Sequence, residues 1–267
     1  GGPTGVELAG ALAEIGQKAM APDFKVLENT ACHILLVEGG TRILDAFPPE
    51  LSRRAQRALE SLGVRVLLTR RVQQVTSQGV LAGSEFIRSA HVIWAAGNVA
   101  SPLLKSLNVP LDSAGRVIVR PDLSLNGDPW VFVIGDAANC SGSEGKALPG
   151  LAAVAMQEGR YVAEMIRRGI PAGDRKPFVY QDRGILATIG RAKAVAQFGP
   201  LSLSGVTAWL VWCFVHIFFL IGFRNRFHVM FEWIWYYLTF KPGARLIYWK
   251  ERRQLQDPEQ SQESRDA

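Results

Sequence analysis

Two glycines near the start of the chain have the spacing of a dinucleotide-binding turn. Gly2 and Gly5 stand as the last two glycines of a G-x-G-x-x-G pattern, directly before a predicted helix from Val6 to about Ile15. In such a turn, Gly2 allows the backbone to approach a pyrophosphate, and Gly5 allows the helix to pack closely on a sheet. The free N–H groups at the helix start also attract phosphate charge. Because this pattern is common by itself, the rest of the chain must support it.

A carboxylate ends the next apolar run. Residues 33–37 form a short predicted strand that is followed by Glu38, and an acid in this place binds the ribose hydroxyls of NAD. Glu38 therefore favours NADH over NADPH, whereas Arg42 is near enough in sequence to attract a 2′-phosphate. The interval from Gly5 exceeds the usual spacing of roughly 20 residues. A strand that ends in a solvated acid is the competing interpretation, and the preceding glycines make it the weaker one.

Two further strand ends could approach a flat cofactor. An apolar run over residues 91–95 closes on small residues, and a second run over 130–134, predicted to be a buried parallel strand, ends at a carboxylate. Small residues let the backbone pass near a cofactor, and Asp136 can accept a hydrogen bond from a ribityl hydroxyl of a flavin. Alternatively, Asp136 caps the helix that follows. The candidate cofactor residues of the two strand ends are Ala96, Gly97, Gly135, Asp136, Ala137 and Ala138.

The composition is that of a globular chain with room for two domains. It has 267 residues, of which 48% are hydrophobic and 20% charged, and a net charge of +6. Lys and Arg are scattered, which argues against a nucleic acid partner. The one dense basic cluster flanks an apolar segment, where an anionic membrane surface is the simpler partner. The three cysteines show no metal or redox spacing, so we predict no metal site and a reducing compartment.

Helical and strand periodicities alternate along the first two thirds of the chain. A helix is predicted over residues 49–62, strands over 64–68, 71–75 and 86–87, and a further helix over 149–165. Pro102, Pro110 and Gly115 interrupt the chain after the apolar run that ends at Gly97, so we place a domain boundary near residue 98. This alternation predicts an α/β fold.

The C-terminal third contains a long stretch without charge. From Ala194 to Phe223 there is no Asp, Glu, Lys or Arg, and within this stretch residues 205–223 are dense in Trp, Phe, Val, Leu and Ile. This apolar run is long enough to be a membrane-spanning candidate. Two arginines intervene, and residues 227–240 are then rich in Trp and Tyr, which favour the depth of lipid headgroups. We therefore expect membrane contact through an interfacial or a spanning helix, with a wholly buried soluble helix as the alternative. The polar tail from Lys250 to Ala267 is predicted to be disordered.

Taken together, these motifs resemble the type II NADH dehydrogenases, the single-chain NADH:quinone oxidoreductases within the two-dinucleotide-binding-domain flavoprotein superfamily. The resemblance covers essentially the whole chain. The stretches that carry it are residues 2–10, 92–97, 133–138, 149–157, 187–191 and 220–226, of which the last two look specific to this family.

The resemblance implies four parts. A Rossmann-like NADH domain would occupy residues 1–97, with its first strand preceding Gly1, and the C-terminal half of a split FAD-binding domain would occupy 98–193. Membrane-associated helices would form a monotopic platform over 194–249, followed by the tail over 250–267. FAD and NADH are the implied cofactors.

The resemblance also implies two catalytic residues. Glu7 matches the family's acid near the nicotinamide and the flavin, where a dry environment would raise its pKa and let it relay a proton. Gln157 matches the second Gln of an Ala-Gln-x-x-x-Gln pattern near the quinone, and Ala153 stands in the place of the first. A neutral amide can donate to a quinone carbonyl without a charge to desolvate. The alternatives are an acid that complements the helix dipole at Glu7 and a surface amide at Gln157.

The implied activity is the transfer of two electrons from NADH through FAD to a lipid quinone, without proton pumping. From the residues alone, a related membrane flavoprotein with another donor or acceptor stays open, as does an NADH-binding membrane module without activity. The expected partners are the quinone and the membrane surface, with a possible homodimer. The expected location is the bacterial inner membrane, with the active site on the cytoplasmic side.

Overall fold

The protein is represented by a computed structural model that divides into two compact units. The first unit runs from Gly1 to His216 and contains all the predicted cofactor-binding and catalytic residues, and the second begins at Ile217. The residues that the structure describes are 1–16, 33–97, 99–142, 145 and 147–239.

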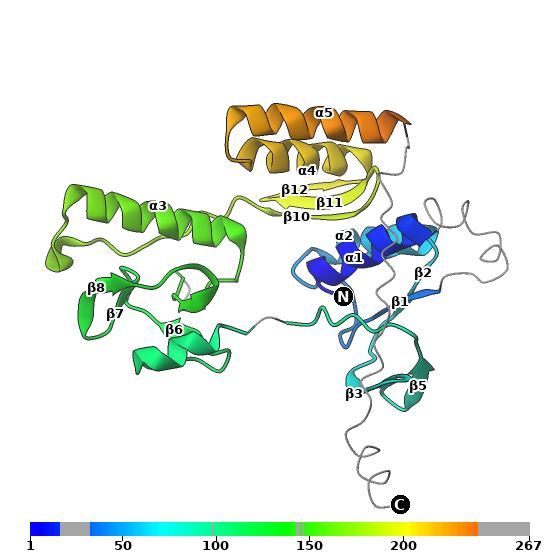
Figure 1. The fold of residues 1–267 in the computed structure, drawn as a ribbon, viewed down its shortest axis with the longest axis horizontal. Coiled ribbons are helices and arrows are strands. Elements are labelled where there is room, and N and C mark those ends of the chain that lie inside the picture. The colour runs from blue at the N-terminus through cyan, green and yellow to red at the C-terminus, as the bar shows by residue number, and fades with distance from the viewer. Residues whose placement is uncertain (17–32, 98, 143–144, 146, 240–267) are drawn as a thin grey trace, which may run out of the picture. The chain divides into compact units, whose positions relative to one another are not determined.

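The first unit opens with a segment of helix, strand, helix and strand (Figure 1). Its elements are α1 (Pro3–Glu14), β1 (Ile34–Val37), α2 (Pro49–Ser61) and β2 (Val64–Leu67). Each helix starts with a proline, whose missing N–H has no helical partner to lose at that position. β1 and β2 pair in parallel, as a Rossmann-like unit requires. All four elements lie where the sequence predicts them.

α1 packs on a second sheet that is distant in sequence. This sheet has three antiparallel strands, β10 (Ile185–Gly190), β11 (Lys193–Phe198) and β12 (Leu201–Ser204). A Cβ atom on Gly10 would overlap the carbonyl oxygen of Ile189, so only glycine permits this approach of helix to strand. One buried apolar cluster includes side chains of α1, α2, β1, β2, β10 and β11. The glycine contact therefore lies within the main core of the unit.

A small antiparallel sheet follows β2. Its strands are β3 (Val72–Thr76), β4 (Gly79–Ala82) and β5 (Glu85–Arg88). The sequence predicts the first and third strands but not β4. Gly79 has a φ of +148°, and a Cβ atom there would overlap the backbone of β5. This glycine therefore makes the tight pairing of β4 with β5 possible.

Residues 91–97 form no strand, which corrects the sequence prediction. A strand needs a hydrogen-bonded neighbour, and no described segment pairs with these residues. Ile93 and Trp94 are 56% and 61% exposed. An apolar run by itself was therefore insufficient to predict a strand here.

The predicted buried parallel strand at residues 130–134 is also wrong. β8 (Asp128–Phe132) pairs in antiparallel fashion with β7 (Ser124–Leu125), and Trp130 is 74% exposed. The parallel pair of this region is instead β6 (Val117–Ile118) with β9 (Ala138–Asn139). A run of apolar residues is buried only where layers cover both faces of its sheet, and this two-stranded hairpin lacks them.

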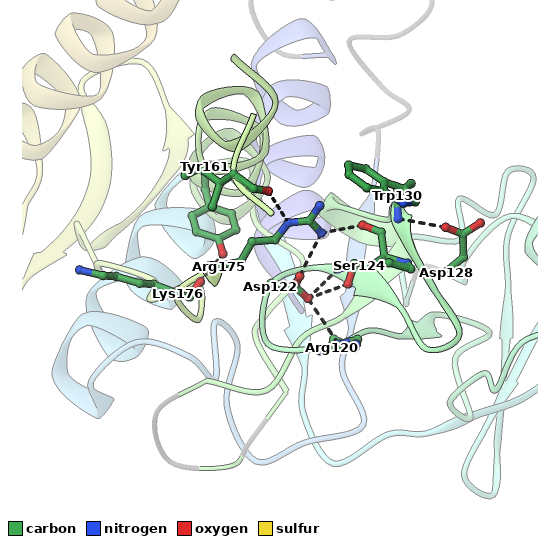
Figure 2. A network of polar contacts seen from close by, with 10 residues as sticks. Arg120, Asp122, Ser124, Asp128, Trp130, Tyr161, Arg175 and Lys176 are labelled. Atoms are coloured by element: carbon green, nitrogen blue, oxygen red, sulfur yellow. Dashed lines mark hydrogen bonds and ion pairs between the residues drawn. The ribbon is translucent and has the colours of Figure 1, made fainter. Parts of the chain in front are cut away.

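A buried ion pair links the β7–β8 hairpin to the segment that follows α3 (Ala152–Arg168). The helix α3 lies at the predicted place. Nη1 of Arg175 lies 3.2 Å from Oδ2 of Asp122 and donates to the carbonyl oxygen of Pro129 at 2.6 Å (Figure 2). Ser124 donates to the other carboxylate oxygen at 2.7 Å. Burial opposes ionisation of Asp122, but the hydrogen bonds outweigh it and lower its pKa. Loss of either partner would leave a buried charge, so the pair fixes this hairpin in place.

The last described elements are two helices, α4 (Val206–Phe219) and α5 (Phe223–Thr239). Gly222, with a φ of +83°, lies between them, so the apolar run predicted over residues 205–223 is not one continuous helix. No helix in the described part of the chain has the length and hydropathy to cross a bilayer.

The predicted start of the helical segment at residue 194 also needs correction. Residues 193–204 form β11 and β12, because Ala194 and Ala196 are small enough to lie in a buried cluster with Ala208 of α4. The four-part domain division stays a prediction. The predicted disordered tail over 250–267 lies outside the described residues.

Gly10 provides a test of the packing of α1 on β10. Gly10→Ala gains about 1 kcal/mol of helix propensity, but its methyl group meets the rigid backbone of Ile189, so we expect a net loss of about 1–3 kcal/mol or more. Gly159→Ala is the matched control, because its Cβ would make an ordinary contact with Ile134 in the middle of α3. The control should raise the free energy of unfolding in urea. Equal stability of the two variants would contradict the close approach.

Candidate functional site

A cavity of about 630 Å³ in the first unit brings four predicted cofactor residues together. Gly97, Gly135, Asp136 and Ala138 line this space, which we call the Gly135 cavity, whereas Ala96 and Ala137 are not among its lining residues. Its size lies within the range of roughly 300–1,000 Å³ that small-molecule and cofactor sites occupy. The other lining residues are Val99, Ala100, Ala114, Arg116, Leu148, Pro149, Gly150, Val154 and Glu158.

Three glycines shape the wall of the Gly135 cavity. Gly97 has a φ of +93°, and a Cβ atom there would meet nothing within 4 Å, so backbone is open to a ligand at this point. Gly135 has a φ of +66° at the start of a short 3₁₀ turn, Gly135–Ala137. A Cβ on Gly150 would lie 3.1 Å from Oδ1 of Asp136, so glycine here leaves room for that carboxylate. These positions form a cradle that larger side chains would fill.

A polar network holds another part of the wall. Asp112 accepts hydrogen bonds from the backbone N–H groups of Ala114 and Arg116, from Nε of Arg116 at 2.7 Å, and from Asn139 at 3.0 Å. Arg116 Nη1 reaches the carbonyl oxygen of Leu148 at 3.4 Å. Burial of Asp112 opposes its ionisation, but the hydrogen bonds outweigh this effect and lower its pKa. The network therefore places the positive charge of Arg116 at the cavity, tied to strand β9.

Glu158 contributes a second carboxyl group to the cavity. It projects from α3, is 2% exposed, and accepts a hydrogen bond from the backbone N–H of Gly135 at 2.5 Å. Burial raises the pKa of Glu158, and the charge of Asp136 raises it further, while the hydrogen bond from Gly135 offsets part of the effect. The two carboxyl groups therefore differ in environment, since Asp136 is exposed.

The sequence reasoning missed Arg116 and Glu158. For Arg116 the sequence offers no local signal, because its role depends on Asp112 and on the fold of the loop. Glu158 has a signal: it lies four residues after Val154 and four before Val162, both buried. An acid on the apolar face of a predicted helix marks a buried carboxyl group.

The glycine turn before α1 and the acid after β1 lie side by side. Gly2 caps the helix in extended conformation, and a Cβ there would meet nothing within 4 Å. A Cβ on Gly5 would lie 3.5 Å from Leu36, which places α1 close on β1. The backbone nitrogen of Gly1 lies 2.8 Å from Oε2 of Glu38. This juxtaposition of an open turn with a carboxylate suits the pyrophosphate and ribose of a dinucleotide.

A hydrogen bond stabilises the charge of Glu38, and the guanidinium of Arg42 pairs with the carboxylate of Asp45. Glu38 is partly buried, and its Oε1 accepts a hydrogen bond from the backbone N–H of Gly40 at 2.6 Å, which favours the charged form. Arg42 donates to Oδ1 and to the carbonyl oxygen of Asp45 at 2.9 and 2.8 Å. The residue expected to compete for a 2′-phosphate is thus engaged by Asp45.

Glu7 lies at the contact between α1 and β10. Its Oε1 accepts a hydrogen bond from the backbone N–H of Thr188 at 3.3 Å. Burial raises the pKa of Glu7, and the Thr188 hydrogen bond and the nearby His216 offset part of this rise. A half-buried acid with a raised pKa fits a proton relay, which stays a prediction.

Gln157 is held by the main chain. Its Nε2 donates to the carbonyl oxygen of Gln181 at 2.9 Å, and its Oε1 accepts from the N–H of Gln181 at 3.0 Å. Both ends of the amide therefore join α3 to the segment before β10. The quinone contact predicted for this side chain stays a prediction.

The described cysteines lie apart from this chemistry. Burial raises the pKa of Cys140 to about 11, so this thiol is protonated and unreactive at neutral pH. Cys140 and Cys213 form no disulfide. In the described ranges, no three His, Cys, Asp or Glu side chains come together as a metal site.

Comparison with known proteins identifies related families. A family profile described as pyridine nucleotide-disulphide oxidoreductase matches residues 1–159, and one described as the NDH2 C-terminal domain matches residues 183–240. The type II NADH:quinone oxidoreductase NdhA of Mycobacterium tuberculosis is 39% identical over 246 residues, 87% of this chain and 51% of that protein. The mitochondrial internal alternative NAD(P)H-ubiquinone oxidoreductase A1 of Arabidopsis thaliana is 31% identical over 88% of this chain and 49% of its own length. The chain thus spans about half the length of the curated relatives it matches.

The fold is shared with a solved structure. The structure of NDH2 from Plasmodium falciparum in complex with NADH has a TM-score of 0.81 at 20% sequence identity, over 91% of this chain and 66% of the other. At this identity the likeness concerns the fold. With the two family matches and the Mycobacterium relative, it supports one assignment: the chain belongs to the pyridine nucleotide-disulphide oxidoreductase family, among its type II NADH dehydrogenases.

Proposed function

We propose that the protein containing this chain transfers two electrons from NADH through FAD to a membrane quinone, without pumping protons. The observation that carries the proposal is the Gly135 cavity, which gathers Gly97, Gly135 and Asp136 in one wall. The relatives named type II NADH:quinone oxidoreductase support the choice of donor and acceptor.

The residues of the Gly135 cavity fit FAD. Open space at Gly97 permits close approach of the backbone, Asp136 provides an acceptor for a ribityl hydroxyl, and Arg116 provides a positive charge for a phosphate. FAD, when bound, supplies the two-electron carrier between nicotinamide and quinone. The chain would contribute the cradle and the charges that orient the cofactor.

NADH would occupy the turn before α1. Gly2 leaves room for the pyrophosphate at the N-terminal end of the helix, where free N–H groups favour its charge. Glu38 would accept the hydroxyls of the adenosine ribose. Its carboxylate would repel a 2′-phosphate, so NADH is the favoured donor.

We place the membrane contact at α5 and the turn before it. Ile221, Phe223 and Phe231 are 90%, 74% and 68% exposed, and an apolar surface of this kind favours a lipid environment. Arg224 lines a groove of about 590 Å³ together with Phe227 and others, and its charge suits anionic headgroups. A lipid quinone would reach the protein from the same surface. The possible homodimer, the bacterial inner membrane and the cytoplasmic side stay predictions.

Asp136 provides the test of the flavin assignment. Asp136→Ala removes a charge-assisted acceptor worth about 1.5–3 kcal/mol, so FAD affinity of the full-length gene product should fall by roughly 10- to 100-fold. The measurement is flavin retained after gel filtration, followed by titration with FAD. Asp45→Ala is the control, since its carboxylate lies on the exposed loop with Arg42. Unchanged FAD affinity of the Asp136 variant would refute this role.

Glu38 provides the test of the donor assignment. Glu38→Gln removes the repulsion of a 2′-phosphate, which is partly screened by solvent at this half-buried site, so the preference for NADH over NADPH should fall by about tenfold. The ratio of kcat/KM for the two donors is the measurement. Glu50→Gln, an exposed carboxylate on α2 that pairs with Arg53, is the control. A wild-type enzyme that favours NADPH would contradict the assignment.

A triple variant tests the membrane surface. Replacement of Ile221, Phe223 and Phe231 by Ser should lower partitioning to lipid vesicles by more than about 100-fold, because each lost side chain contributes about 1.5–3 kcal/mol when buried. Because all three are exposed, the fold should tolerate the change. The control replaces Leu103, Ile166 and Val179, which are 73%, 66% and 69% exposed in the first unit, by Ser. Equal vesicle binding of the two triple variants would place the membrane contact elsewhere.

A further inference from the structure

The Gly135 cavity holds a group for which the proposed electron transfer has no assigned role. Glu158 is buried, yet its carboxyl group lines the cavity and binds the turn that carries Asp136. A charged side chain in such a place is costly unless it is paired, and no cation among the described residues forms an ion pair with it. Its function must therefore be sought in the contact with the turn.

α3 contacts the Gly135–Asp136 turn at two neighbouring positions. Ala155 and Glu158 are three residues apart, so they lie on the same side of the helix. A Cβ atom on Gly135 would lie 3.3 Å from the Cβ of Ala155, while Glu158 accepts the N–H of the same glycine. The helix therefore fixes the backbone position of Gly135 and also pairs with its N–H group.

The charged and titratable groups around Glu158 come from three segments. Asp136 follows Gly135 in the 3₁₀ turn and disfavours a second negative charge. Cys140 follows β9, and its thiol stays protonated below a pKa of about 11. Arg116 lines the cavity from the loop before β6 but is paired with Asp112 at 2.7 Å. Burial and Asp136 thus favour the neutral acid at position 158.

We propose that Glu158 is a positioning residue for FAD: in its neutral form it fixes the Gly135–Asp136 turn and leaves Asp136 as the one negative charge that the described residues contribute to that wall. This inference rests on the proposed function. Loss of the proton from Glu158 would add a second negative charge beside Asp136 and close to the phosphates of the cofactor. FAD binding should therefore weaken when Glu158 ionises.

The sign of the pH effect follows from the direction of the shift. The pKa of Glu158 in the folded protein is raised above its ordinary value of 4.5. The stability that the neutral acid contributes is complete below that value, and it is lost as the pH rises through the higher pKa of the folded protein. FAD affinity should fall over the same interval.

The test measures the dissociation constant for FAD as a function of pH in the full-length gene product. The wild-type constant should rise with pH, and Glu158→Gln should remove this dependence, because its amide oxygen accepts the same N–H but cannot ionise. Glu158→Ala should bind FAD about tenfold more weakly than Glu158→Gln at every pH, since it removes the acceptor. Glu164→Gln is the matched control on α3, because this exposed carboxylate pairs with Arg167 on the helix surface and should change neither value.

A second readout does not depend on the cofactor. The amide hydrogen of Gly135 should exchange slowly in the wild type and in Glu158→Gln, and faster in Glu158→Ala. Wild-type protein that binds no FAD would overturn the proposed function. FAD binding whose pH dependence survives in Glu158→Gln, or Gly135 exchange that is unchanged in Glu158→Ala, would overturn only the role of Glu158.

Discussion

The first unit depends on one backbone contact, the passage of α1 across β10. At the crossing Gly10 has no side chain, and the carbonyl of Ile189 occupies the space that a Cβ atom would need. This contact joins the first residues of the unit to strands almost at its end. It also brings the side chains of Glu7 and Glu14 to the backbone of β10 and the residue after it, where they accept hydrogen bonds. A helix at ordinary distance would leave these carboxyl groups without those donors.

The carboxyl groups of the protein show how burial and donors decide charge. Asp112 and Asp122 each accept several hydrogen bonds that outweigh desolvation, so their pKa values are lowered. Glu7 and Glu158 have one backbone donor each, which is too little to offset burial, so their pKa values are raised. The same functional group therefore favours its charged form in one place and its neutral form in another. For a nucleotide enzyme this separation matters, because the phosphates of the ligands tolerate few negative charges nearby.

α3 organises the candidate flavin site more than any strand does. It presents Ala155 and Glu158 to the Gly135 turn, and it holds the segment before β10 through Gln157. The strands near the cavity are only two residues long in β6 and β9. Loops therefore build most of the site, and the helix together with the Asp112 network holds them. Such a site can be precise only if its polar contacts are satisfied, as those of Asp112 are.

The sequence by itself determined the local elements and the ligand chemistry. Gly2, Gly5 and Glu38 pointed to a dinucleotide, and α1, α2 and α3 followed from helical periodicity, because these signals are encoded within a few turns of chain. Only the tertiary structure decided that residues 91–97 and 130–134 are not buried strands, since a strand exists through its neighbours. Likewise, only the structure showed that Glu158 contacts Gly135 in the cavity wall that also contains Asp136. Glu158 and Gly135 are far apart in the chain, and residues of distant segments meet through packing, which no local sequence pattern records.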